Sequence, residues 1–253
     1  MLLSASELIS QSVALYKTKF KSFLPYIGLI SVVTIVTTLI GTYLFPIILG
    51  SSQSTWITSG ESIVISIITG ILNLWFMVAL INAIAQLHTG QKITPLADML
   101  KGASNKIIPA FLASLLVAVM TVAGFIFFIV PGLLFMIWFI FTTQGIALDN
   151  KKPIAAIKAS KQLVTKRWWP VFWRIIAPGF VFIIIIWIAQ FIIGFLLTSL
   201  TNAVGSSTAM SIVSSIVLTL TAIVFLPLTS IAQTILYLDL QSKPYAKSVQ
   251  EVA

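Results

Sequence analysis

The ionisable side chains of this sequence are few, and their types leave little room for chemistry. The 253 residues include six acidic residues, one histidine, His88, and no cysteine. General acid–base catalysis needs ionisable groups that face a shared site, and thiol nucleophiles and thiolate metal sites need cysteine. Gly145, Gly179 and Gly194 match no phosphate-binding loop. The composition therefore favours a protein with no catalytic site, no cofactor and no metal.

Uncharged polar residues do occur inside the apolar runs. In lipid such side chains seek partners on neighbouring helices, so helix–helix hydrogen bonds are the simpler interpretation. A polar path or a lipid-headgroup pocket is the alternative. The candidate intramembrane polar contacts are Asn73, Asn82, Gln86, Gln144, Gln190 and Gln233.

The elements that carry these residues are predicted to be membrane-spanning helices. Hydrophobic residues make up 58% of the chain and charged residues 8%, whereas soluble domains carry about 25% charged residues. A helix needs roughly 20 apolar residues to cross a bilayer. A turn at Pro131-Gly132 and a polar loop at 201–208 divide the two longest uncharged runs. We predict one all-α domain over residues 1–253, with spans at 23–45, 63–87, 107–130, 133–148, 175–199 and 211–238.

The positions of the basic residues predict the orientation of these spans. All 15 lysines and arginines precede the first span, follow the last, or lie between spans two and three or four and five. In the other connections Glu61 is the only charged residue. Cytoplasmic loops are enriched in lysine and arginine, so both termini are predicted to be cytoplasmic in a multi-pass plasma-membrane protein. The net charge of +9 then reflects topology and anionic lipid, and no nucleic-acid partner is expected.

Three shorter helices are predicted before the first, third and fifth spans, around residues 4–21, 94–104 and 153–166. Ser4-x-x-Glu7 has the pattern of a capping box, and Pro95 and Pro153 suit the first position of a helix. Amphipathic basic helices of this kind lie in the membrane interface. We therefore expect three units, each an interfacial helix followed by a transmembrane hairpin.

Short motifs in the second half of the chain resemble a known prokaryotic family, the six-helix membrane domain attached to some glycerophosphodiester phosphodiesterases and its stand-alone relatives. The motifs are Val130-Pro131-Gly132-Leu133, Ala147-Leu148-Asp149, the segment 155–164, Trp168-Trp169-Pro170 and the segment 236–241. The resemblance implies a membrane module of prokaryotic origin. It brings no catalytic residue, because no segment has room for a soluble phosphodiesterase domain.

The connection between spans four and five is the richest in charge, with seven basic residues from Lys151 to Arg174. Anchoring by an aromatic belt is one interpretation of its tryptophans, and binding to anionic lipid is the other. The candidate lipid-headgroup contacts are Lys158, Lys161, Lys166, Arg167, Trp168, Trp169 and Arg174.

Three classes of function remain open at this point. A non-catalytic membrane module, with a scaffold, assembly or lipid-organising role, fits the sequence best. A carrier for a small molecule or lipid is the alternative, because Pro178-Gly179 and Pro227 interrupt the last two spans. An intramembrane enzyme fits least, since nucleophile, metal ligand and base are missing.

Reporter fusions test the topology. Fusions after Gly90, Asn150 and the C-terminus should report the cytoplasm, and fusions after Thr55 and Gly205 the opposite side, because lysine and arginine favour the cytoplasmic loops. A cytoplasmic signal after Thr55 would contradict the scheme, since every later assignment depends on the first span.

Overall fold

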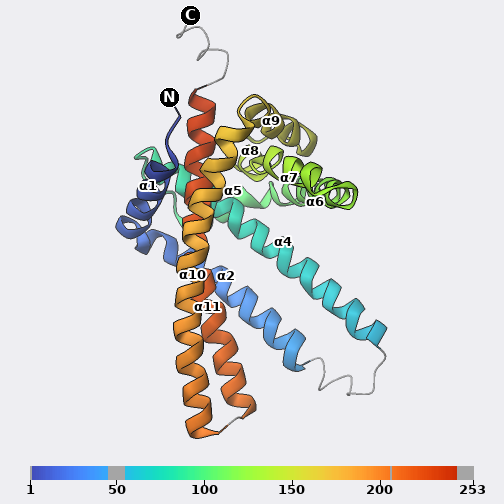
Figure 1. The fold of residues 1–253 in the computed structure, drawn as a ribbon, viewed down its shortest axis with the longest axis vertical. Helices are drawn as coiled ribbons and strands as arrows, with labels where there is room; N and C mark the ends of the chain where they lie inside the picture. The colour runs from blue at the N-terminus through green and yellow to red at the C-terminus, as the bar shows by residue number, and fades with distance from the viewer. Residues whose placement is uncertain (1, 45–54, 206, 244–253) are drawn as a thin grey trace, which may run out of the picture.

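The computed structural model describes residues 2–44, 55–205 and 207–243, and this part of the chain is helical with no strand (Figure 1). The elements in chain order are α1 (Ala5–Thr18), α2 (Phe20–Leu39), the π-helical turn η1 (Ile40–Leu44), α4 (Thr55–His88), α5 (Leu96–Ser104), α6 (Ile107–Phe127), α7 (Ile129–Trp138), α8 (Thr142–Asp149), α9 (Pro153–Thr165), α10 (Trp168–Val204) and α11 (Thr208–Ser242).

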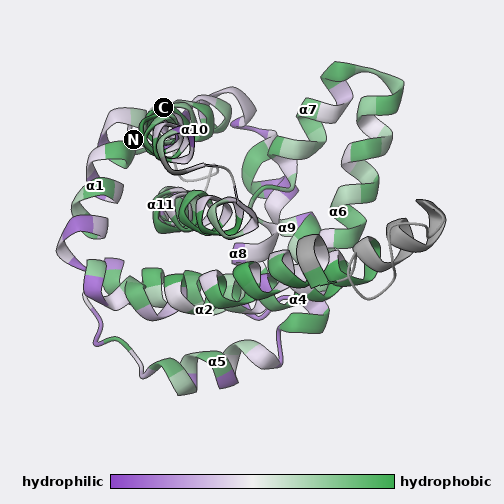
Figure 2. Cartoon of the chain, turned by 90° about the horizontal axis from the view of Figure 1, so that it is seen from below, coloured by the Kyte–Doolittle hydropathy of each residue, from purple (hydrophilic) through white to green (hydrophobic). Residues whose placement is uncertain are grey.

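Six helical segments are long and apolar enough to cross a membrane. They are Phe20–Leu39, Ile63–His88, Ile107–Phe127, Ile129–Asp149, Trp168–Ala203 and Thr208–Ser242. Figure 2 shows apolar residues along most of their length. The prediction of an all-α protein with six candidate spans is confirmed, although the end of the first predicted span, at Phe45, lies outside the described residues.

The turn between the third and fourth spans comes earlier than the sequence predicts. Phe128 is the extended residue that separates α6 from α7, with φ −164° and ψ 157°. Pro131 and Gly132 lie inside the first turn of α7. The first N–H groups of a helix have no partner within it, so a proline there begins a helix rather than breaking one.

Two further boundaries differ from the prediction. The fourth span is not one helix, because α7 ends at Trp138 and α8 begins at Thr142. The predicted polar loop at 201–208 is shorter, since α10 continues to Val204. Gly205 ends that helix with φ +95°, a backbone conformation that glycine adopts without steric cost.

Helices occupy all three windows predicted to hold non-spanning helices. Ser4 and Glu7 form the predicted capping box at the start of α1. Pro95 is the residue before α5 rather than its first residue, and Pro153 begins α9. Each of these helices precedes a pair of long ones. Their position at a membrane interface stays a prediction.

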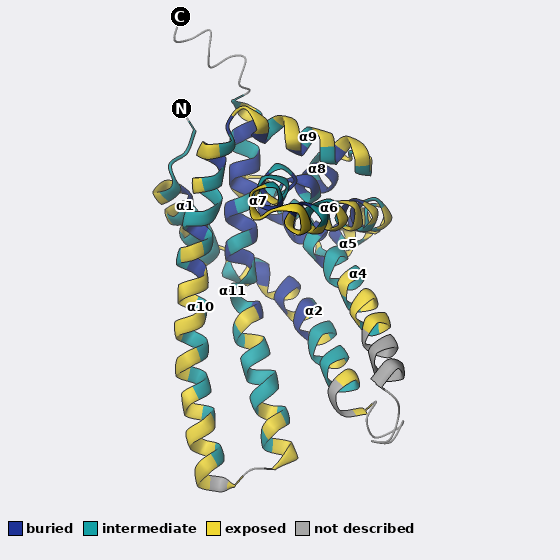
Figure 3. Cartoon of the chain, turned by 45° about the vertical axis from the view of Figure 1, so that its right-hand side comes forward, coloured by how far each residue is buried: buried dark blue, intermediate teal, exposed yellow. Residues whose placement is uncertain are grey.

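Helices that follow one another in the chain contact as pairs, α2 with α4, α6 with α7, and α10 with α11, and α2 also contacts α11. The pairs diverge from a common end of the molecule, and α6 and α7 run across the direction of α10 and α11 (Figures 1 and 2). Buried residues concentrate at the common end, whereas the far part of α10 is largely exposed and that of α11 is mostly of intermediate burial (Figure 3). Helices with exposed apolar sides are stable when lipid surrounds them, because lipid tails are as apolar as the side chains.

The buried core at the common end combines helices from the whole chain. Leu8 of α1, Phe23 of α2, Leu80 of α4 and Ile231 of α11 are all fully buried within it. This core holds the ends of the three helix pairs together, and α8 and α9 contribute buried residues to it.

Two glycines allow α6 and α7 to approach closely. A Cβ atom on Gly124 would lie 3.0 Å from the Cα of Gly132, and a Cβ on Gly132 would lie 2.4 Å from the ring of Phe125. Small residues commonly mark the contacts between membrane helices, because they let backbones approach.

Replacing Gly124 with leucine should destabilise the α6–α7 pair by about 1–3 kcal/mol, because overpacking forces the backbones apart. The measurement is thermal unfolding in detergent. Gly194→Leu is the matched control, since a Cβ there meets nothing within 4 Å. Equal losses in the two variants would contradict the close-packing explanation.

Candidate functional site

Polar side chains gather around the turn that joins α8 to α9. Asp149 ends α8, and Asn150 makes the turn in the left-handed conformation with φ 53°. The Asp149 carboxylate accepts hydrogen bonds from the Tyr237 hydroxyl and the Gln241 amide, both at 2.7 Å. It also forms an ion pair with Lys151. Tyr237 and Gln241 lie one turn apart on α11, so this network attaches the α8–α9 turn to the last helix.

A buried serine bridges the break between α7 and α8. Ser160 of α9 is 2% exposed. Its hydroxyl donates to the carbonyl of Trp138 at 2.7 Å and accepts from the N–H of Phe141 at 3.1 Å. These are backbone groups beside the interruption, where the helical hydrogen-bond ladder stops. One side chain from α9 therefore satisfies both sides of the break.

A lysine binds a backbone carbonyl near the C-terminal end of α8. The Lys106 ammonium, just before α6, donates to the carbonyl of Ala147. Cations are favourable near the C-terminal end of a helix, where carbonyl groups point outward. Partial burial lowers the pKa of Lys106 below the usual range of lysine. This contact ties the start of α6 to the end of α8.

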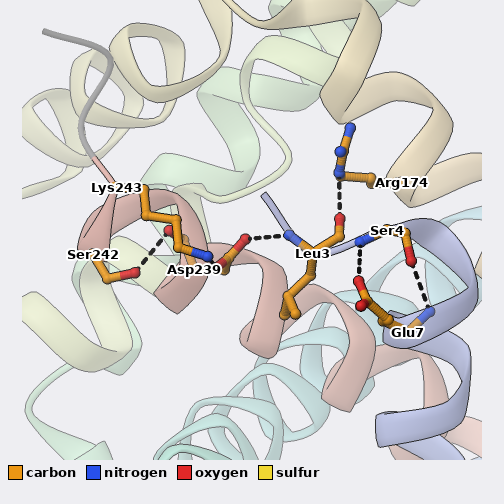
Figure 4. Close-up of polar contacts among 7 residues, drawn as sticks. All are labelled: Leu3, Ser4, Glu7, Arg174, Asp239, Ser242 and Lys243. Carbon is orange, nitrogen blue, oxygen red and sulfur yellow. Dashed lines mark hydrogen bonds and ion pairs between the residues drawn. The ribbon is translucent and has the colours of Figure 1, made fainter. Parts of the chain in front are cut away.

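The segment before α1 is tied to α10 and α11 through its backbone (Figure 4). The N–H of Leu3 donates to the Asp239 carboxylate at 2.9 Å, and Arg174 Nε donates to the Leu3 carbonyl at 2.5 Å. Asp239 also pairs with Lys243 at 2.7 Å. In the adjoining capping box, hydrogen bonds from Ser4 hold the pKa of Glu7 below its usual range.

The two aspartates that end spans therefore have separate partners. Asp149 pairs with Lys151, and Asp239 pairs with Lys243. Each aspartate therefore contacts a lysine close to it in the sequence. Within residues 2–44, 55–205 and 207–243, no group of three or more histidine, cysteine, aspartate or glutamate side chains could hold a metal ion.

The predicted headgroup residues do not form one cluster. Lys158 faces a groove beside α6, whereas Lys166 and Arg167 line a hollow of about 340 Å³ between α9 and α11. Lys161 lies over the ring of Trp138, 4.6 Å from its centroid. Arg167 is 9% exposed, so its side chain belongs largely to the interior.

The aromatic residues at the start of α10 stack on one another. The rings of Trp168 and Trp169 are 5.3 Å apart, and that of Phe172 is 5.0 Å from Trp168. Trp169 is 59% exposed and Trp173 52% exposed. Arg174 donates to backbone carbonyls of Leu3 and, at 2.9 Å, of Pro170. The outer rings are thus free to meet lipid, while the guanidinium has partners inside the protein.

The predicted polar contacts of α4 are local. Asn82 Nδ2 donates to the carbonyl of Val78, one turn earlier, at 2.8 Å. Gln86 donates to the Thr94 hydroxyl and accepts from the Thr94 N–H, both at 2.9 Å. The second pair of bonds fastens the loop that leads to α5. Asn82 and Gln86 lie one turn apart, but they serve different partners.

The other predicted polar residues join neighbouring helices or stay buried. Gln190 donates to the carbonyl of Leu218 at 3.1 Å and links α10 to α11. Gln144 Nε2 lies 3.4 Å from Gln233 Oε1, which links α8 to α11. Asn73 Oδ1 is buried and has no hydrogen-bond partner within the described part of the chain.

Comparison with known proteins places the chain in a family. The model of a family described as a domain of unknown function (DUF7847) matches residues 60–240, which is more than half of the 253-residue chain. The chain belongs to this family. No curated protein and no solved structure matches it. The matched region contains Asp149, Lys151 and Tyr237 but ends just before Gln241, and it leaves out α1 and α2.

Several residues that organise the polar contacts described above were not among the residues predicted from the sequence. Ser160 has no signal of its own, because a serine on an amphipathic helix fits the polar face equally well. Lys106 looks like one more topology-determining charge. Tyr237 and Gln241 carried a usable signal, since polar groups four residues apart at the end of an apolar helix share a face.

Replacing Ser160 with alanine should destabilise the fold by about 1–3 kcal/mol, because two buried backbone groups lose their partner. Thermal unfolding in detergent measures the change. Thr165→Ala is the matched control on the same helix, because the Thr165 hydroxyl is exposed and bonds only its own helix. Unfolding temperatures that fall equally in both variants would rule out the bridging role.

Proposed function

We propose that the protein is a non-catalytic membrane module that organises anionic lipid at the cytoplasmic face, in a scaffold or assembly role. One observation carries the proposal: five of the six predicted intramembrane polar residues form hydrogen bonds within the protein, Asn73 being the exception. Asn82 bonds its own helix, Gln86 fastens a loop, and Gln190 links α10 to α11. These bonds support helix packing as the role of the polar residues and leave them little capacity to bind a solute.

The size of the cavity beside Pro178 supports a module over a carrier. This cavity lies between α10 and α11, includes Gln233 and Thr229 in its lining, and has a volume of about 90 Å³. Ligand pockets usually measure about 300–1,000 Å³. It has room for a few water molecules and is small for a lipid headgroup or metabolite.

The proposal also specifies the orientation of the chain, its host membrane and the location of its short helices. Both termini face the cytoplasm of a prokaryotic cell, the plasma membrane is the host membrane, and α1, α5 and α9 lie in its interface. The positive-inside pattern and the apolar stripes of these helices support this arrangement. The resemblance to the membrane domain of glycerophosphodiester phosphodiesterases supports a modular role, and the protein partner is not identified.

The proposal predicts that lysines of α9 retain anionic lipid. Lys158, Lys161 and Lys166 should be replaced together by glutamine, and Arg167 left in place because it is buried. Juxtamembrane basic residues gain roughly 1 kcal/mol each from an anionic leaflet, so phosphatidylglycerol carried through purification should fall several-fold. Lipid mass spectrometry measures it, and arginine at the same three positions is the charge-matched control.

A lipid-flipping assay separates the module from the carrier. Proteoliposomes with fluorescent phosphatidylglycerol and phosphatidylcholine should flip lipid no faster than protein-free vesicles. Faster flipping would favour the carrier. Equal lipid retention by the glutamine variant and the unchanged protein would mean that these charges serve only to orient the chain during insertion.

A further inference from the structure

A groove lies between the first half of α6 and the start of α9. Its volume is about 620 Å³, which falls within the usual range of ligand sites, roughly 300–1,000 Å³. Apolar side chains make up most of its wall, and two lysines complete it. The lining residues are Leu112, Leu115, Leu116, Lys152, Pro153, Ile154, Ala155 and Lys158.

Two consecutive lysines in the turn before α9, Lys151 and Lys152, line different hollows. Lys151 pairs with Asp149 and lines the hollow toward α11. Lys152 instead lines the groove, together with Lys158. Both groove lysines are exposed, and the described residues include no acidic partner for either of them. The groove therefore has two positive charges and no negative one.

The leucines of the groove are open rather than covered by another element. Leu112, Leu115 and Leu116 are 46%, 52% and 43% exposed, and Ile154 across the groove is 61% exposed. The groove therefore combines exposed leucines from α6 with two lysines at the start of α9, and a phospholipid likewise combines apolar chains with a charged headgroup.

We propose that this groove binds one anionic phospholipid, with the phosphate between Lys152 and Lys158 and an acyl chain along Leu112, Leu115 and Leu116. This inference rests on the proposed function and names a specific site for it. The occupant is a lipid rather than free phosphate because the wall offers alkyl side chains. The two lysines and the first N–H groups of α9 would attract free phosphate as well, so the apolar wall is the feature that favours a lipid.

The test is native mass spectrometry of the full chain in neutral detergent, titrated with phosphatidylglycerol. Phosphatidylcholine and inorganic phosphate are parallel probes. The double variant Lys152→Gln, Lys158→Gln should weaken phosphatidylglycerol binding roughly tenfold or more, because each basic residue near an anionic surface contributes substantially. The control Lys17→Gln, Lys21→Gln removes the same charge from exposed positions on other helices and should leave binding nearly unchanged.

A second variant tests the apolar wall without changing charge. Leu115→Trp should fill the groove and weaken phosphatidylglycerol binding, and it should fold because position 115 is half exposed. Val119→Trp is its control on the same helix, one turn beyond the groove lining. Unfolding temperatures verify that both tryptophan variants are folded.

Four results would overturn the site. Equal losses from the two lysine pairs would mean diffuse attraction to the basic surface, and the proposed function would stand without the groove. Unchanged binding in Leu115→Trp would exclude the groove as the place of the acyl chain. Displacement of phosphatidylglycerol by an equal concentration of inorganic phosphate would indicate a site for phosphate rather than for lipid. If the unchanged protein bound no more phosphatidylglycerol than phosphatidylcholine, the groove and the proposed function would fail together.

Discussion

Backbone N–H and C=O groups in the apolar helices must find hydrogen-bond partners within the protein, because hydrocarbon offers none. An unbroken helix meets this requirement alone, and each interruption or loose end needs a polar side chain from elsewhere. Ser160 serves the break between α7 and α8, Lys106 the end of α8, and Arg174 the segment before α1. Trp75 likewise donates to the carbonyl of Leu100 in α5, at 2.8 Å. Most of the interior polar chemistry is therefore structural.

The same solvent permits the apolar sides of the helix pairs to stay exposed. In water the exposed faces of α6 and α10 would have to be buried, and the pairs would collapse on each other. Lipid removes this driving force, so specific contacts decide which helices touch. These contacts concentrate at the common end, where the buried core and the polar network of Asp149 lie together. The result is a buried end with basic residues around it and apolar helices whose exposed sides suit lipid.

Local patterns predicted the fold well, and long-range pairing limited the prediction of the site. Hydropathy and proline position are properties of short stretches, so the spans and the helices before them could be read directly. The break after Trp138 could not, because it depends on Ser160 more than twenty residues later. Lys158 and Lys166 look equivalent in the sequence, yet they lie on different sides of α9. Only the packing of α9 between α6 and α11 separates them.

The hydrogen bonds of Leu3 with Asp239 and Arg174, called the Leu3 clasp below, have a consequence for the order of assembly during synthesis. Leu3 and Asp239 are 236 residues apart, and a ribosome adds about 5–20 residues per second. Leu3 is therefore synthesised tens of seconds before Asp239, its partner on α11. The Leu3 clasp can form only when the last helix is in place. It thus acts as a closing step of assembly, and a chain that stops before α11 leaves its first helix without this anchor.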